Sequence, residues 1–371
     1  MRAFGTYAAG ALLVGGLLAG CAGDEPAPTA EPSSTPGTTE SPGTSESPST
    51  IDGPTESPDG GPVAPTAALL DWTPTGESPD DVVVVGGQWR VRVPGEGDRA
   101  ELRGPDGPRT IEAGTGRRIE EVLLDEEWLV VVAQDEQGTR AAEATVVELS
   151  TGDGRRLTPP PASGGSWAMH GGTLHYPTTG PQETYCLAAF DLASGQGEVD
   201  YCAAPRHGFA GVVASSTTTA LMTFDDARPV SCRTLATLTD GVAEPLAEAP
   251  ACTGWDVAAT PTGAVWSVLT DENQVGVGAF SASADGATYD LGTGATGTLT
   301  PCGDSVYFAR NAAGGQPAQL LRWTPEATLE VAYEAPGDGP GFLGEPACAG
   351  DVLTVSAFGA GGDEQVSAVA P

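Results

Sequence analysis

Short runs of apolar, aromatic and β-branched residues recur along the chain at a nearly constant spacing from residue 88 onward. Polar turn residues follow each run, as they do where strands end in tight turns. Consecutive runs start 40, 45, 47, 44, 41 and 46 residues apart, which predicts seven copies of one unit of about 44 residues. The seven runs are residues 88–93, 128–132, 173–176, 220–224, 264–268, 305–308 and 351–355.

The third unit shows the content of one repeat. It contains four candidate strands, at residues 166–169, 173–176, 185–190 and 198–201, separated by turn-forming residues. Four short antiparallel strands in 40 to 50 residues are typical of one blade of a β-propeller. The sequence therefore predicts an all-β protein, a β-propeller of seven blades. Six or eight blades, or another all-β fold, remain alternatives.

The last unit ends after about two strands, at residues 366–370. Propellers commonly close their ring with a strand from the other terminus, and residues 67–72 are free to supply it. Closure removes the edge strands that would otherwise pair with other chains. We therefore assign residues 67–371 to the propeller. Trp255-Asp256 occurs only once, so no named propeller subfamily is indicated.

Composition agrees with this fold and excludes two classes of partner. The chain has 52 Gly and 32 Pro with 39% hydrophobic residues, which favours strands and turns over helices. It carries 50 acidic and 16 basic residues, for a formal charge of -34, and every basic residue is Arg. Binding to nucleic acid or to anionic lipid by charge requires a cationic surface, so both are excluded.

The N-terminus has the pattern of a secretory signal peptide. Arg2 precedes an apolar stretch at residues 8–18, which is too short for a stable membrane span. The motif Leu18-Ala19-Gly20-Cys21 that follows resembles the lipobox of bacterial lipoproteins. The resemblance implies a signal peptide at residues 1–20, a diacylglyceryl group on Cys21, and a lipid-anchored protein on the extracytoplasmic face of the cell membrane. An ordinary signal peptide with a chance Cys is the alternative.

Residues 21–66 are expected to be a disordered tether behind the acylated Cys21. From residue 22 to residue 66 there are ten Pro and eight Asp or Glu, with no Arg and no aromatic residue. Such a segment cannot bury enough apolar surface to offset its ordering entropy. The absence of Lys and the Ala, Gly, Thr and Arg usage resemble those of actinobacterial proteins.

Six cysteines remain after Cys21, in a domain predicted to be exported to an oxidising compartment. Cys186 and Cys232 lie 13 and 12 residues after the starts of their runs, and Cys202 and Cys252 lie 29 and 32 residues after the same starts. These matching positions predict the disulfides Cys186–Cys202 and Cys232–Cys252. By exclusion, Cys302 and Cys348 bridge successive blades. With three His and no Cys-x-x-Cys, a metal site is disfavoured.

Histidines and acidic pairs are the first candidates for chemistry. His170 and His175 flank Gly171-Gly172 and could bind a metal across a turn, while His207 beside Arg206 could join an anion-binding loop. Acidic residues follow several runs and could bind Ca²⁺, but the EF-hand spacing is absent. Packing, exposure and turn chemistry are the interpretations we prefer. The acidic positions are Asp135-Glu136, Asp225-Asp226 and Asp271-Glu272 with Asn273.

Aromatic and basic residues give a second set of candidates. The tryptophans could line a sugar-binding surface, but three fall in or open the repeated runs, which favours blade packing. Two Arg pairs, predicted in turns between the early units, could bind an anion or form surface ion pairs. The tryptophans are at positions 72, 89, 128, 167, 255, 266 and 323, and the pairs are Arg117-Arg118 and Arg155-Arg156.

No linear motif for a nucleophile, a phosphate loop or a metalloprotease is present, so we assign no catalytic, cofactor-binding or metal-binding residue. The preferred interpretation is a monomeric, non-catalytic binding or scaffold module at the cell surface, with an unknown protein or glycan ligand at the face around the central channel. A propeller enzyme that cleaves cell-wall glycan or peptide with Asp or Glu as acid and base is the alternative. A third possibility is support for assembly of a neighbouring membrane complex.

Overall fold

A computed structural model describes residues 62–225, 232–271, 273–337 and 339–371, all within one compact unit of the chain, Thr55–Pro371. The predicted signal peptide, Cys21 and the tether as far as residue 61 lie outside the described residues. In the described part, the only helical element is a short 3-10 turn, η1 (Pro181–Glu183), and no helix is long and apolar enough to cross a membrane.

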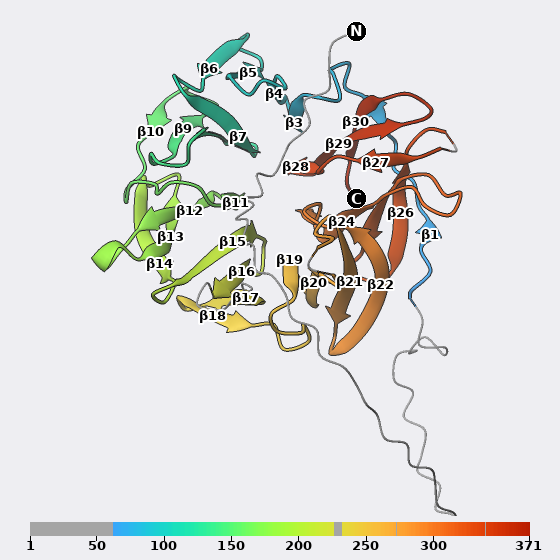
Figure 1. The fold of residues 1–371 in the computed structure, drawn as a ribbon. Coiled ribbons are helices and arrows are strands. Elements are labelled where there is room, and N and C mark those ends of the chain that lie inside the picture. Colours follow the sequence, from blue (N-terminus) through green and yellow to red (C-terminus); the bar gives the residue numbers. More distant parts are fainter. Residues whose placement is uncertain (1–61, 226–231, 272, 338) are drawn as a thin grey trace, which may run out of the picture. The chain divides into compact units, whose positions relative to one another are not determined.

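Seven sheets follow one another around a ring (Figure 1), which confirms the predicted seven-bladed propeller. The strands, from innermost to outermost, are β3 (Val82–Gly86), β4 (Trp89–Val93), β5 (Arg99–Arg103) and β6 (Arg109–Glu112) in blade 1; β7 (Arg117–Leu124), β8 (Trp128–Asp135), β9 (Glu143–Glu148) and β10 (Gly154–Arg155) in blade 2; β11 (Ala168–His170), β12 (Thr173–Thr179), β13 (Tyr185–Asp191) and β14 (Gln196–Cys202) in blade 3; β15 (His207–Ala214), β16 (Thr219–Asp225), β17 (Cys232–Thr239) and β18 (Val242–Pro245) in blade 4; β19 (Gly254–Thr260), β20 (Gly263–Val268), β21 (Val277–Ala284) and β22 (Ala287–Ala295) in blade 5; β23 (Thr300–Cys302), β24 (Ser305–Arg310), β25 (Gln319–Trp323) and β26 (Leu329–Glu334) in blade 6; and β27 (Gly341–Leu343) with β28 (Ala347–Ala349), β29 (Val352–Gly359), β30 (Glu364–Val369) and β2 (Thr73–Pro74) in blade 7.

The repeated runs of the sequence correspond to the second strand of every blade, from β4 to β29. Neighbouring blades cover both faces of these strands, so their side chains are apolar on both sides. In β8 all eight residues are buried, and Leu129, Val130 and Val132 have no exposed surface. This two-sided burial explains why continuous apolar runs, and not alternating ones, mark the repeat.

The hydrophobic core lies between blades. One cluster packs Val91 and Leu102 of blade 1 against Leu129 and Val131 of blade 2, and it also includes Ala349 of blade 7. Similar clusters join each of the following pairs of blades. The inner strands also contact one another around the ring, including contacts between β3 and β7, β15 and β19, and β28 and β3. Each blade therefore depends on both neighbours for its buried surface.

The N-terminal segment closes the ring, as predicted, but it does so with two short strands. β2 pairs antiparallel with β30 and completes blade 7, whereas β1 (Thr66–Ala67) pairs parallel with β26 and adds a fifth strand to blade 6. The predicted closing strand at residues 67–72 falls mostly between them, because the chain crosses there from blade 6 to blade 7. Contacts with the propeller begin at Val63, whose N–H donates to the Asp290 carbonyl at 2.7 Å.

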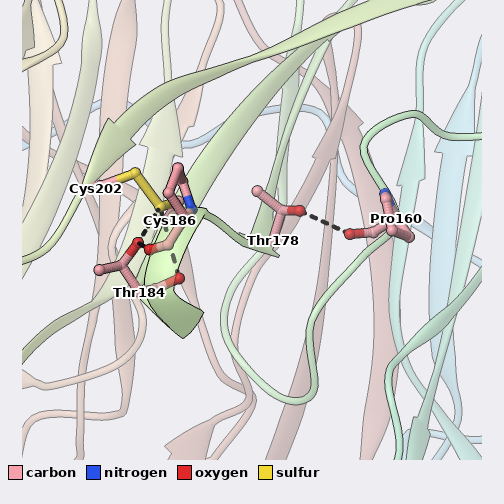
Figure 2. The surroundings of a disulfide bond; sticks show 6 residues. Pro160, Thr178, Thr184, Cys186 and Cys202 are labelled. Atoms are coloured by element: carbon pink, nitrogen blue, oxygen red, sulfur yellow. Dashed lines mark hydrogen bonds between the residues drawn. A yellow bond between two sulfur atoms is a disulfide. The ribbon is translucent and has the colours of Figure 1, made fainter.

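Three disulfides are present, and they are the pairs that the cysteine spacing predicts. Cys186–Cys202 joins β13 to β14, and Figure 2 shows this bond with the Thr184 hydroxyl 3.4 Å from the Cys186 sulfur. Cys232–Cys252 joins the start of β17 to the connection that leads into blade 5. Cys302–Cys348 joins β23 of blade 6 to β28 of blade 7, next to the place where the ring closes.

Removal of Cys302–Cys348 should cost more stability than removal of Cys186–Cys202. The two bonds span 46 and 16 residues. Because a longer closed loop restricts the unfolded chain more, removal of the bonds should lower the free energy of unfolding by about 4 and about 3 kcal/mol, respectively. The double variants Cys302→Ala with Cys348→Ala, and Cys186→Ala with Cys202→Ala, would be compared by urea unfolding. Only the first should also speed amide exchange in β23 and β28. A larger loss for the second variant would contradict this expectation.

Candidate binding site on the inner strands

Irregularities interrupt the inner strands of four blades. The register shifts between Ile119 and Glu121 in β7, between Ala210 and Val213 in β15, and between Gly254 and Val257 in β19. In blade 7 the inner position is divided into β27 and β28, with residues 344–346 between them. Bulges redirect side chains away from the regular alternation of a strand, and they are common next to binding and active sites.

Three of these irregularities carry a carboxyl group, from Glu121, Asp256 and Glu345. Two of the carboxyls accept hydrogen bonds from the backbone of the next blade. The Trp167 N–H donates to Glu121 Oε2 at 3.0 Å, and the Gly297 N–H donates to both Asp256 carboxylate oxygens at 3.1 Å. Glu345 has no hydrogen-bond partner in the described part of the chain; its residue keeps exposed surface, while the surrounding protein partly desolvates its carboxyl. Glu121 and Asp256 therefore link blades, whereas Glu345 is available to a ligand.

Burial favours the protonated form of all three groups, and the charge of a neighbouring acid adds to this effect for Glu121 and Glu345. Burial is the largest cause that raises the pKa of Glu121 to about 8; the Trp167 hydrogen bond opposes the rise, and the charges of Glu345 and Glu120 add to it. Burial also raises the pKa of Asp256 against the hydrogen bonds from Ser267 and Gly297. The pKa of Glu345 is raised by burial and by the charge of Asp256.

The three carboxyls interact across three blades. The charge of Glu345 in blade 7 raises the pKa of Glu121 in blade 2, and the charge of Asp256 in blade 5 raises the pKa of Glu345. Among the described residues, none of the three carboxyls forms an ion pair with Arg or His. A ligand with an ammonium, guanidinium or hydroxyl group would supply the missing positive charge or hydrogen bonds.

A metal ion is a poorer match. Throughout the described ranges, no group of three or more His, Cys, Asp or Glu side chains is close enough together to hold one. His170 is exposed at its turn, and His175 is half-buried with Nε2 3.3 Å from the Thr219 hydroxyl. Burial lowers the pKa of His175, which keeps the ring neutral. The structure therefore brings no third ligand to this histidine pair.

His207 is the first residue of β15, the inner strand of blade 4. It is exposed, with Nε2 3.8 Å from Asp225 and Nδ1 3.1 Å from the Pro205 carbonyl. Together with Tyr201, Thr223 and Val242 it lines an open pocket of about 320 Å³ between blades 3 and 4.

Asp135 and Asp271 organise turns, whereas Asp225 ends the strand β16. Asp135 accepts hydrogen bonds from the N–H and hydroxyl of Thr139 and from Arg140, and the Arg140 bond is the largest cause of its strongly lowered pKa. Asp271 accepts from Asn273 and Gln274 in the same manner. The Asp271 arrangement is an Asx turn, and Asp135 organises a longer turn through Thr139 and Arg140, as the turn-chemistry interpretation expects. Asp226 and Glu272 lie outside the described residues.

Most of the aromatic and basic candidates serve packing and ion pairing. Trp89, Trp128, Trp167, Trp266 and Trp323 are buried, whereas Trp72 and Trp255 are half-buried, so they form no exposed platform for a sugar. The prediction that both Arg pairs lie in turns is wrong for Arg117, Arg118 and Arg155. Arg117 and Arg118 open β7, because their backbone continues the pairing with β8, and Arg155 ends β10. Arg117 pairs with Glu143 at 2.8 Å and Arg155 with Glu148 at 3.1 Å.

Sequence reasoning missed the three inner-strand carboxyls. One available signal was the spacing of exactly one repeat between polar positions on the inner strands. Ser166 lies 45 residues after Glu121, and Asp256 lies 45 residues after Gly211. The Gly211 N–H donates to the Ser166 hydroxyl at 2.9 Å, which continues the series of bonds between blades.

No protein-family model matches the chain, and no curated protein matches it in sequence. Solved structures do match. A prolyl endopeptidase structure is 12% identical with a TM-score of 0.51, and the match covers 74% of this chain and 44% of that one, so this chain spans less than half of its length. The β-propeller domain of the trilobed protease from Pyrococcus furiosus, which has an open velcro topology, is 11% identical with a TM-score of 0.55 and coverages of 77% and 93%. An oligogalacturonate lyase in complex with manganese is 12% identical, with a TM-score of 0.47 and coverages of 83% and 99%. At these identities the likeness to the two proteases shows the propeller fold alone.

The raised pKa of Glu121 predicts that stability falls with rising pH. The folded protein retains this proton up to pH about 8, whereas the unfolded chain releases it near the ordinary value of 4.5. Within that window the folded state binds more protons, so the free energy of unfolding should decrease as the pH rises. Glu121→Gln retains an acceptor for the Trp167 N–H and should flatten the dependence by up to about 1.4 kcal/mol per pH unit.

Urea unfolding between pH 5 and pH 8 would measure this slope. Glu248→Gln, at an exposed acid of blade 4, is the control for the loss of one charge and should behave as the wild type does. A wild-type slope in Glu121→Gln would contradict the expectation.

Proposed function

We propose that this protein is a lipid-anchored, extracytoplasmic β-propeller that acts as a non-catalytic binding or scaffold module and engages its partner at the inner strands of the ring. The observation that carries the proposal is the set of three carboxyls on Glu121, Asp256 and Glu345, which no Arg or His of the described residues neutralises. An unneutralised set of acids costs stability, and a partner that supplies positive charge relieves that cost.

The chemistry of the site favours a cationic partner group. Ammonium and guanidinium groups donate several hydrogen bonds and carry the charge that the three carboxyls lack. The formal charge of -34 would speed the approach of a basic partner surface and repel an acidic one. We therefore favour a protein or amino-sugar ligand that presents Lys, Arg or amine groups.

Binding is favoured over catalysis because the surroundings of all three carboxyls shift their pKa values in the same direction, upward. A general acid and a general base need environments that push their pKa values apart. Here burial raises the pKa of Glu121, of Asp256 and of Glu345 alike. Among the residues that the structure describes, no carboxyl with a lowered pKa is coupled to these three as an ionised base or nucleophile. The propeller-enzyme alternative therefore has less support than a binding role.

Cross-linking in intact cells would test the binding role. The variant Glu121→Gln, Asp256→Asn, Glu345→Gln removes the central charges with little change of shape. We expect it to reduce the yield of the cross-linked partner at least tenfold, because the carboxyls can ionise against the partner's cations whereas the amides cannot. A matched control, Asp240→Asn, Glu244→Gln, Glu248→Gln, removes three exposed charges from blade 4 and should leave the yield unchanged. Equal yields from both variants would contradict a site at the inner strands.

The lipid anchor has its own test. Cys21→Ala removes the thiol that the lipobox resemblance designates for acylation. Since two or three acyl chains hold a protein stably at a membrane, the variant should lose label from a radioactive fatty acid and leave the membrane fraction. A Ser34→Ala variant of the predicted tether is the control. Fatty-acid label retained by Cys21→Ala would exclude this anchor.

A further inference from the structure

Residues 62–72, which we call the front segment, lie across the outer edges of blades 5 and 6 before the chain reaches β2. Val63 bonds to the Asp290 carbonyl of β22. Thr66 and Ala67 then pair with Glu330 and Val331 of β26. Further on, the Leu70 N–H and the Trp72 indole N–H donate to the Ala332 carbonyl at 3.0 and 2.7 Å.

The front segment is only lightly held. Both residues of β1 are exposed, and Leu69 exposes 58% of its surface. Trp72 is its main anchor: it is half-buried, with its ring centroid 5.2 Å from that of Tyr333, and Val63 and Leu70 also pack, partly buried, against the core. Blade 6 has its four antiparallel strands without β1, so the front segment adds to a sheet that is already complete.

The next residues are held very differently. Thr75 and Gln365 are buried, at 7% and 4% exposure. The Thr75 N–H and hydroxyl donate to the Gln365 carbonyl and to its side-chain oxygen at 2.9 and 3.0 Å. The Gln365 amide in turn donates to the Asp81 carbonyl at 2.8 Å. This lock of Thr75, Gln365 and Asp81, with β2 beside it, joins blade 7 to blade 1.

We propose that the front segment is a releasable extension of the tether: it peels from blades 5 and 6 as a unit while the lock keeps the ring closed. Few buried contacts and exposed backbone hydrogen bonds are the features of segments that open locally. Its eleven residues would add at most about 40 Å of reach between the anchor and the ring. The cellular meaning of this extension rests on the proposed membrane anchor, whereas the two-step release itself does not.

Single-molecule pulling of residues 22–371 would test the release. One handle would be attached at residue 22 and the other in the Gly171-Gly172 turn of blade 3, where neither glycine has another residue within 4 Å of an added Cβ. We expect a reversible first transition that lengthens the chain by at most about 40 Å, followed at higher force by opening of the ring. Because the measurement uses no membrane, its failure is distinguishable from failure of the lipid anchor.

Two variants should affect different transitions. Trp72→Ala should lower the force of the first transition alone, and Trp72→Phe, which keeps a ring against Tyr333 but loses the indole N–H, should give an intermediate value. Gln365→Leu removes the hydrogen bonds that the Gln365 side chain makes in the lock, while the bond from the Thr75 N–H to the Gln365 carbonyl remains, and it should lower the force of the second transition alone. Val242→Ala, at an exposed position of blade 4, should change neither. A single transition in the wild type, or both variants acting on the same transition, would overturn the proposal.

Discussion

Burial of both faces of every sheet is the constraint on which this structure depends. A blade covers its second strand only if a neighbour lies on each side, as the complete burial of β8 shows. The core is accordingly divided into clusters between blades, and the ring has to close for the first and last blades to be covered. Closure is achieved by β2 on blade 7 and is reinforced by Cys302–Cys348 between blades 6 and 7.

Polar contacts between blades follow the same period as the apolar ones. The bonds from Trp167 to Glu121 and from Gly211 to Ser166 join residues 46 and 45 positions apart, and Cys302–Cys348 spans 46. Equivalent positions on the inner strands thus connect each blade to the next. At Glu121 and Asp256 the connecting group is a carboxyl, so one side chain both links blades and contributes negative charge at the inner strands.

Linking two blades favours a buried group, whereas a negative charge is costly to bury. An acid that does both is better explained by a binding function than by structure alone. A neutral hydroxyl such as that of Ser166 makes the same kind of link without the cost of a buried charge. Acids at two of these positions, with Glu345 added at the break in blade 7, destabilise the unliganded ring when they ionise. Such a cost is typical of sites that are completed by a ligand. The front segment is held loosely and the lock that follows it is held tightly. The tether can therefore move without disturbing the inner-strand carboxyls.

Much of the fold could be predicted from the sequence. The spacing of the apolar runs predicted seven blades, because two-sided burial marks each second strand with a continuous apolar segment. The same period aligned Cys186 with Cys232 and Cys202 with Cys252, so three pairings could be chosen among fifteen. The N-terminal closure was also predictable, because the last unit lacks strands.

The sequence by itself determined the repeat, the blade number and the disulfides, since each follows from local patterns that recur with one period. Only the tertiary structure decided where the inner strands bulge and which carboxyls interact. A bulge depends on the register between two strands, and the register shift at Glu121 leaves no separate mark in the local pattern. Glu121 and Glu345 lie 224 residues apart in the chain, and they come within electrostatic range only because the ring closes between them.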